Sequence, residues 1–203
     1  MRTLVLASQS SRRRLLLEKA GFEFEVYPVE ISENLKENLR LDDALMDLAR
    51  RKARHLIDSG KLSKIQDFLV LASDTEVISE GRVFGKPQSL EQNQEFLALL
   101  SGKTHDVKTA LCLWDGVTGR VVFHLETTKI TFENLSPPLI NAYVTSHRPL
   151  DKAGGYGIQE LPPGFVRLIV GSVENVIGLP IDAVERILVE NGWQVSRRKF
   201  PAS

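Results

Sequence analysis

The sequence predicts a mixed α/β fold with a partly antiparallel sheet, because strand-like and helix-like segments alternate along its 203 residues. The apolar run 68–72 has the pattern of a central strand that is buried on both faces. Leucines recur at intervals of three and four residues through 41–58, as in an amphipathic helix. Two long strand-like segments, 105–115 and 120–133, follow each other across a short glycine-containing turn.

Local signals define the remaining elements in order. An apolar run at 3–7 is expected to form a strand, followed by a helix at 11–20 and a strand at 23–29. Glu80-Gly81 is the expected turn of a short hairpin, and Ser89 opens a capping box before a helix at about 90–101. Towards the C-terminus we expect a helix from Ser136-Pro137 to about 146 and a strand near 165–170. A last helix is expected from about 180 to 191, with Gly192 at its C-cap.

Composition indicates one ordinary globular domain, 1–203, with a basic C-terminal tail at about 196–203. Lys+Arg and Asp+Glu number 26 each, which disfavours bulk attraction to nucleic acid or to an anionic membrane. No apolar stretch approaches the length of a bilayer span. A single cysteine, Cys112, excludes an intrachain disulfide and favours a cytoplasmic location.

The segment 4–14 is the strongest functional signal. An apolar run leads into Ser8 and Ser10 and then into three arginines that open a helix. Free backbone N–H groups and the positive end of the helix dipole favour an anion there, and arginine binds phosphate oxygens in a bidentate way. Cations at a helix N-terminus oppose the dipole and need a compensating anion, so we expect a polyphosphate site rather than a plain surface patch.

Two charged residues stand out in otherwise apolar surroundings. Asp74 follows the strand-like run 68–72, where a catalytic base or metal ligand is expected, although it could also cap the next turn. Lys52 falls at the centre of the apolar stripe of helix 41–58. It either extends past its neighbours to solvent or reaches inward to a phosphate or carboxylate.

Two glycine-containing segments carry weaker signals. Lys86 lies between Gly85 and Pro87, in a turn that could meet a phosphate or be plain surface. The segment 151–159 combines flexible backbone with Lys152, an aromatic ring and the amide of Gln159, a set suited to closing over a nucleotide. A structural turn would have the same composition.

Taken together, these segments resemble the Maf family of nucleoside triphosphate pyrophosphatases, which is linked by name to septum formation. The resemblance runs through nearly the whole chain in the family's order. It is carried by residues 7–13, 48–53, 74–75, 85–87, 101–105, 151–159 and 175–180. It implies a central twisted mixed sheet with flanking helices and two lobes separated by a cleft, similar to the inosine-triphosphatase-like fold.

The resemblance also implies a reaction and the residues that perform it. Members split the α–β bond of a nucleoside triphosphate with a divalent metal, Mg²⁺ or Mn²⁺, to give a monophosphate and pyrophosphate. Asp74 matches the proton acceptor, and Glu33 with Asp74 matches the metal ligands. The phosphate-binding positions are matched by Ser8, Arg12, Arg13, Lys52, Lys86 and Lys152. A homodimer is a further expectation from the resemblance alone.

Base preference divides the family, and Arg12, Thr75 and Gln159 are similar to the dTTP/UTP branch. Canonical or modified pyrimidine triphosphates are therefore the expected substrates, with a role in nucleotide house-cleaning and division arrest. The alternatives are a pyrophosphatase for 7-methyl-GTP or another triphosphate, and a non-catalytic nucleotide sensor that regulates septation. Three positions depart from the family pattern: Ser11 in place of Pro, Ser32 in place of Asp and Arg51 in place of Glu.

Overall fold

The computed structural model describes residues 1–198, and it confirms a mixed α/β fold. The strands are β1 (Thr3–Leu6), β2 (Phe24–Val26), β3 (Phe68–Ser79), β4 (Arg82–Phe84), β5 (Thr104–Asp115), β6 (Val121–Phe132) and β7 (Val166–Val170). The helices are α1 (Ser11–Lys19), α2 (Leu41–Asp58), α3 (Leu90–Leu100), α4 (Pro137–His147), the 3-10 turn η1 (Ala153–Gly155), α5 (Val173–Ile177) and α6 (Ile181–Glu190). Within this part of the chain, no helix has the length and hydrophobicity of a membrane span.

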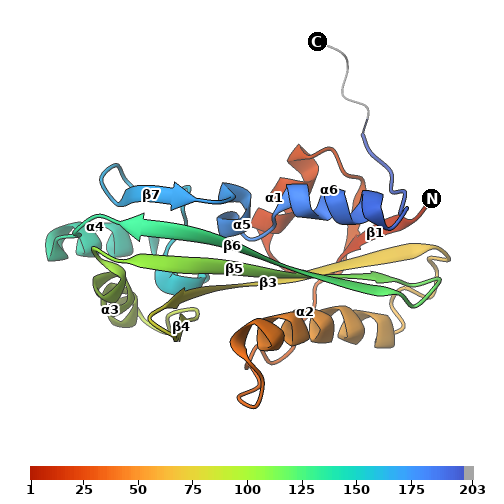
Figure 1. Cartoon of the computed structure of the whole chain (residues 1–203), viewed down its shortest axis with the longest axis horizontal. Helices are drawn as coiled ribbons and strands as arrows, with labels where there is room; N and C mark the ends of the chain where they lie inside the picture. Colours follow the sequence, from red (N-terminus) through yellow and green to blue (C-terminus); the bar gives the residue numbers. More distant parts are fainter. Residues whose placement is uncertain (199–203) are drawn as a thin grey trace, which may run out of the picture. The chain divides into compact units, whose positions relative to one another are not determined.

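The strands are hydrogen-bonded in the order β2-β1-β3-β5-β6-β7, and β4 pairs with β3 (Figure 1). β1 is parallel to both β2 and β3, whereas β4 is antiparallel to β3 and β7 is antiparallel to β6. This mixed pattern agrees with the expected partly antiparallel sheet.

The chain forms two compact units. Unit 1 comprises Met1–Asp74, Thr109–Glu126 and the described part of Gly178–Ser203, and unit 2 comprises Thr75–Lys108 and Thr127–Ile177. β3, β5 and β6 contribute residues to both units, and the chain passes from unit 1 to unit 2 directly after Asp74.

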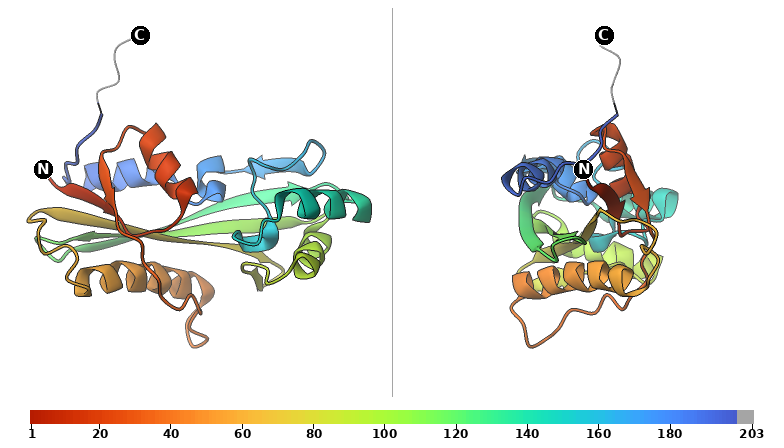
Figure 2. Two further views of the ribbon diagram at one scale, coloured as in Figure 1. Left: turned by 180° about the vertical axis from the view of Figure 1, so that it is seen from behind. Right: turned by 90° about the vertical axis from the view of Figure 1, so that its right-hand side faces the viewer.

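In unit 1 the central strands are buried on both faces. Val5 of β1 and Val70 of β3 pack with Leu45, Ala49 and other apolar residues of α2. Alternate residues of the same strands, such as Leu4 and Leu69, point to the opposite face and are fully buried as well. Helices α1 and α6 lie on that side, and α2 lies on the other (Figures 1 and 2).

Unit 2 has its own core, which is rich in aromatic side chains. Phe132 makes edge-to-face contacts with His105, Tyr156 and Phe165. Helix α3 packs against α4 and against η1. The β3–β4 hairpin turns at Glu80 and Gly81, both with positive φ, as the sequence predicts.

The structure corrects the sequence analysis at β3. The strand was expected to cover the apolar run 68–72, with Asp74 just beyond its end, but β3 continues to Ser79. Thr75, Val77 and Ile78 continue the β-branched character of the strand, and Val77 and Ile78 pair with β4. Asp74 therefore lies inside β3. It is the neighbouring β1 that ends early, because its pairing with β3 stops at Leu6 opposite Leu71.

The two ends of the described chain meet in unit 1. Arg2 bridges to Val195, and the guanidinium of Arg197 lies over the ring of Phe22 while donating to Glu185. The expected basic tail begins in this region, and its last part, 199–203, lies outside the described residues.

Candidate active site

The turn from β1 into α1 is built on serine hydroxyls. Ser10 is the N-cap of α1, and its Oγ accepts a hydrogen bond from the Arg13 backbone N–H at 3.4 Å. Ser8 Oγ accepts from the Ser10 N–H and from Arg13 Nη1, each at 3.2 Å. Ser11 takes the first helical position, where proline is also favoured, so the departure from the family pattern leaves the cap intact.

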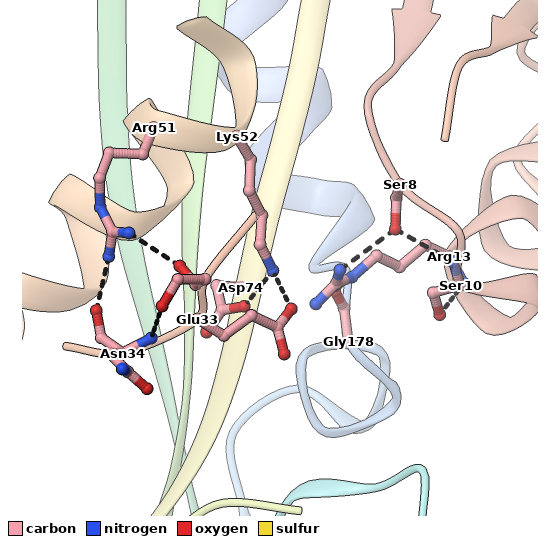
Figure 3. A network of polar contacts seen from close by, with 10 residues as sticks. Ser8, Ser10, Arg13, Glu33, Asn34, Arg51, Lys52, Asp74 and Gly178 are labelled. Atoms are coloured by element: carbon pink, nitrogen blue, oxygen red, sulfur yellow. Dashed lines mark hydrogen bonds and ion pairs between the residues drawn. The ribbon is translucent and has the colours of Figure 1, made fainter. Parts of the chain in front are cut away.

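Arg13 turns back toward unit 1 rather than out to solvent. Its Nε donates to the Gly178 carbonyl at 3.0 Å, on the segment that leads into α6 (Figure 3). Burial lowers the pKa of its guanidinium, the negative charge of Asp74 opposes that effect, and the neighbouring Arg12 adds to it. Arg13 is thus a cation within the electrostatic reach of Asp74. Arg14 pairs with Glu18 on the exposed face of α1.

Lys52 is the link between α2 and β3. Its side chain is only 8% exposed, and its Nζ donates to Asp74 Oδ1 at 2.5 Å and to Glu33 Oε1 at 2.7 Å (Figure 3). Of the two expected orientations of Lys52, the structure therefore has the inward one, and the anionic groups that it reaches are two carboxylates. One ammonium holds together two acidic residues that are 41 positions apart in the sequence.

The exposed loop that carries Glu33 is fixed by a neighbouring arginine. Arg51 donates to the carbonyls of Ser32 and Asn34, each at 2.8 Å (Figure 3). Its Nε also donates to Asp47, a buried carboxylate of α2, at 3.0 Å. Arg51 thus forms hydrogen bonds with the backbone on both sides of Glu33.

Asp74 combines burial with an unsatisfied oxygen. The residue is 5% exposed, and its Oδ2 has no hydrogen-bond partner among residues 1–198. A buried carboxylate oxygen without a donor is costly, and such atoms in native proteins call for a water, an ion or a ligand. The carboxylate, held by Lys52 on one side, is therefore suited to accept a proton from water or to coordinate a cation.

Comparison with known proteins places this arrangement in a family. Residues 3–191 match the family described as Maf-like protein. The chain belongs to the Maf family. It is 46% identical over 185 residues to a dTTP/UTP pyrophosphatase of Bdellovibrio bacteriovorus, covering 91% of this chain and 96% of that protein.

Other relatives in the Maf family carry the same name. A dTTP/UTP pyrophosphatase of Thermotoga maritima is 40% identical over 94% of this chain and 90% of its own length. One of Bacillus thuringiensis subsp. konkukian is 41% identical over 93% of this chain and 95% of its own. The resemblance drawn from the motifs is confirmed.

The residues present fit a hard divalent cation of the kind expected for a Maf protein. The carboxylates of Glu33 and Asp74 can supply oxygen ligands and are held close together by the Lys52 ammonium. Asp74 Oδ2 has no hydrogen-bond partner within the described residues. Within residues 1–198 no group of three or more His, Cys, Asp or Glu is arranged for a metal. Mg²⁺ is commonly bound by only one or two carboxylates, with waters and substrate phosphates completing its shell, so this donor set is compatible with it.

The other predicted site residues lie in unit 2. Thr75 follows Asp74 on β3, and Lys86 is exposed in the turn after β4. Lys152 precedes η1 and pairs with Asp151 at 2.8 Å and with Glu160 at 3.4 Å. Gln159 is exposed in the turn after η1. Their roles in substrate binding and specificity stay predictions.

Unit 2 joins the two glycine-containing segments to each other. The Gly154 N–H donates to the Gly85 carbonyl at 3.1 Å, so the turns that carry Lys86 and Lys152 are neighbours. Asn93 of α3 donates to the Gly155 carbonyl at 2.8 Å. His105 Nε2 lies 2.7 Å from the Tyr156 hydroxyl, and burial lowers the pKa of His105 to about 4, which keeps it neutral.

Several of these supporting contacts were not predicted from the sequence. Asn93 and Asp47 lie outside the motifs, and Gly178 lies in the segment 175–180 without any assigned contact. The sequence does hold a signal for Asp47. It is adjacent to Leu48 on the buried side of α2, and Arg50 and Arg51 follow it at the helical spacings of three and four residues. The bond from Arg13 to Gly178 joins residues 165 positions apart and has no local signal.

Proposed function

We propose that this protein hydrolyses dTTP and UTP to the nucleoside monophosphate and pyrophosphate. The names of its relatives support the substrates, and the site in unit 1 supports the reaction. The observation that carries the proposal is the buried Lys52 ammonium that holds Asp74 and Glu33 together, with one Asp74 oxygen left unsatisfied.

Asp74 acts as the proton acceptor. Its Oδ2 takes a proton from water as the water oxygen forms a bond to the α-phosphorus. The bond between the α-phosphorus and the bridging oxygen breaks, and pyrophosphate leaves with that electron pair. Lys52 holds Asp74 Oδ1 at 2.5 Å, so the rotamer of the carboxylate is fixed and Oδ2 faces the reacting water.

Cations on the unit 1 elements bind the polyphosphate and offset its charge. Arg12 and Arg13 lie in the first turn of α1, at the positive end of the helix dipole and near the hydroxyl of Ser8. Donors that are already oriented stabilise charge as it develops in the transition state. By the family pattern, Lys86 and Lys152 add further phosphate contacts, and Arg12, Thr75 and Gln159 select a pyrimidine base.

Glu33 and Asp74 would hold Mg²⁺ or Mn²⁺ when it is bound. Such an ion neutralises phosphate charge and lowers the pKa of a coordinated water. The role of the chain is to present two carboxylates at one place, and Arg51 and Lys52 together keep Glu33 there.

The protein is proposed to work in the cytoplasm, in nucleotide house-cleaning and division arrest. The single cysteine supports this location: Cys112 is a buried free thiol whose pKa burial raises to about 12. We also propose that the protein forms a homodimer, as the resemblance to the Maf family implies.

Product analysis tests the reaction and its substrates together. Purified protein is incubated with dTTP, UTP, CTP, 7-methyl-GTP and 5-methyluridine triphosphate, with Mg²⁺, with Mn²⁺ or with EDTA, and products are followed by phosphorus NMR. We expect monophosphate and pyrophosphate from dTTP and UTP, and none in EDTA. Preference for 7-methyl-GTP would replace the substrate assignment. Binding without turnover of any triphosphate would favour the sensor, and release of inorganic phosphate would contradict the bond that is proposed to break.

A further inference from the structure

A pocket lies in unit 1 between the exposed flank of α2 and Trp114 of β5. It has a volume of about 510 Å³, which is within the range of small-molecule sites. Its lining residues are Ile31, Arg50, Arg51, Arg54, His55, Asp58 and Trp114. Neither Lys52 nor Asp74 is among them, and none of these side chains has a task in the proposed reaction beyond the support that Arg51 gives to the Glu33 loop.

The walls of this pocket are cationic. Three arginines and one histidine face a single lining carboxylate, Asp58, which pairs with Arg54 at 2.6 Å. The nearby Asp47 binds Arg50 at 2.7 Å and Arg51 at 3.0 Å, and Lys36 at 3.1 Å offsets its charge. The three arginines and Lys36 together outnumber the two aspartates by two charges, so the pocket favours an anion.

The three arginines differ in how many groups they bind and in how exposed they are: Arg50 pairs with Asp47 and Arg54 pairs with Asp58, and both arginines lie at the exposed surface of α2. Arg51 is committed to Asp47 and to two loop carbonyls. Arg50 and Arg54 have side chains more than half exposed, and they lie four residues apart on the same face of α2. Both can turn toward a phosphate, whose oxygens match a guanidinium better than a single carboxylate does.

An aromatic wall completes the pocket. Trp114 of β5 is half-buried, and the Arg54 guanidinium lies 5.6 Å from its ring centroid. Ile31 adds an apolar surface. A flat ring can be held against such groups, because nucleic-acid bases stack on aromatic side chains through their faces.

We propose that this pocket is a second nucleotide site, which holds the phosphate of a mononucleotide at Arg50 and Arg54 and its base against Trp114. The site is separate from the Lys52–Asp74 pair, and its existence does not depend on the proposed hydrolysis. UMP is the probe, because it carries one phosphate and one base and is not a triphosphate substrate.

Fluorine NMR of protein labelled with 5-fluorotryptophan reads this pocket directly. The chain has two tryptophans, and a Trp114→Phe variant assigns the two signals. UMP is expected to shift the Trp114 signal saturably and to leave that of the buried Trp193 in place. Uridine and inorganic phosphate, at matched ionic strength, are each expected to bind at least tenfold more weakly. A shift no larger than that caused by KCl, or phosphate binding as tight as UMP, would overturn the proposal.

Two double variants separate this pocket from the catalytic site. R50Q/R54Q is expected to weaken UMP binding at Trp114 at least tenfold and to leave hydrolysis of UTP unchanged. The control R14Q/R186Q removes two exposed helical arginines elsewhere in unit 1 and is expected to keep the binding. If the Trp114 shift survives in R50Q/R54Q and disappears in Arg12→Gln, the signal comes from the catalytic site and the second site does not exist.

Discussion

Lys52 stabilises two acidic groups that would otherwise repel each other. Its ammonium is almost fully buried and lies between the buried carboxylate of Asp74 and the carboxylate of Glu33, whose side chain is 44% exposed. Removing one partner of a buried ion pair leaves an uncompensated charge, which typically costs about 3–5 kcal/mol. The pair therefore matters for stability as well as for the proposed chemistry.

Replacement of Lys52 by Met is expected to lower the free energy of unfolding by about 3 kcal/mol and to reduce hydrolysis at least a hundredfold. Urea denaturation and steady-state kinetics measure the two effects. The matched control is Lys61→Met, at an exposed position just after α2. Equal behaviour of the two variants would show that Lys52 does not hold the carboxylates.

Asp115 is a second buried carboxylate, and it has a structural role in unit 1. It accepts bonds from Arg2 at 2.9 and 3.0 Å, from the Trp193 indole N–H at 3.1 Å, and from backbone N–H groups of its own turn. Burial opposes its ionisation, but the hydrogen bonds from Arg2, Val117 and Thr118 prevail and lower the pKa of Asp115 to about 2.

This depressed pKa predicts a defined loss of stability in acid. The contribution, about 2 kcal/mol, is present above the ordinary carboxyl pKa near 4 and is lost as pH falls toward 2, because protonation weakens the bonds to Arg2. Unfolding free energies of the wild type and Asp115→Asn, measured from pH 6 to pH 2, are expected to differ above pH 4 and to converge near pH 2. A constant difference over this range would exclude the titration of Asp115 as the cause.

At the residue scale, the sequence supported predictions wherever the signal was local. The helix that begins at Ser11 and the position of Lys52 on an apolar stripe both follow from patterns within one element. The role of Asp115 could not be predicted, because an Asp-Gly pair is equally typical of a plain turn and its partner Arg2 is 113 positions away.

At the scale of elements, η1 and its flanking turn depend on glycine. Gly155 has a φ of +70°, and a Cβ at this position would lie 2.0 Å from Asn93 Nδ2. Asn93 is buried and donates to the Gly155 carbonyl, so it cannot move without losing that bond. The turn that carries Lys152 and Gln159 therefore requires a residue without a side chain.

Gly155→Ala is expected to destabilise unit 2 by about 2 kcal/mol or more and to raise the KM for the nucleotide with a smaller effect on kcat. The matched control is Gly164→Ala, which has a similarly positive φ of +87° but no atom within 4 Å of its Cβ. The double variant N93A/G155A removes the clash and is expected to recover part of the lost stability. If both single variants behave alike, backbone strain alone accounts for the effect.

Element positions were predicted well, and element ends less well. Helix α2 agrees with the expected 41–58, because its apolar period is unbroken. β3 was expected to end early because the apolar run stops at Ser73, whereas pairing with β4 carries the strand on to Ser79. The short helix α5 was not expected, since five residues carry too little periodicity to be recognised.

At the scale of the molecule, the fold class followed from the sequence, whereas the strand order did not. The order β2-β1-β3-β5-β6-β7 depends on pairings between distant segments, such as Thr3 with Phe68. The pocket lined by Arg50, Arg51 and Arg54 could not be predicted from the overall charge either, because acidic residues elsewhere in the chain balance its cations. Long-range contacts, not local preferences, decide these features.

The chemistry proposed for the whole protein rests on Asp74, and Asp74→Asn tests it most directly. The amide keeps the shape of the side chain and loses the basic oxygen, so kcat/KM for dTTP and UTP is expected to fall by a factor of about 100 to 10,000. Circular dichroism and nucleotide binding check that the fold is retained, and Asp106→Asn, a half-exposed carboxylate paired with Lys129, is the matched control. Near wild-type pyrophosphate release by the folded Asp74→Asn protein would contradict the assignment of Asp74 as the proton acceptor.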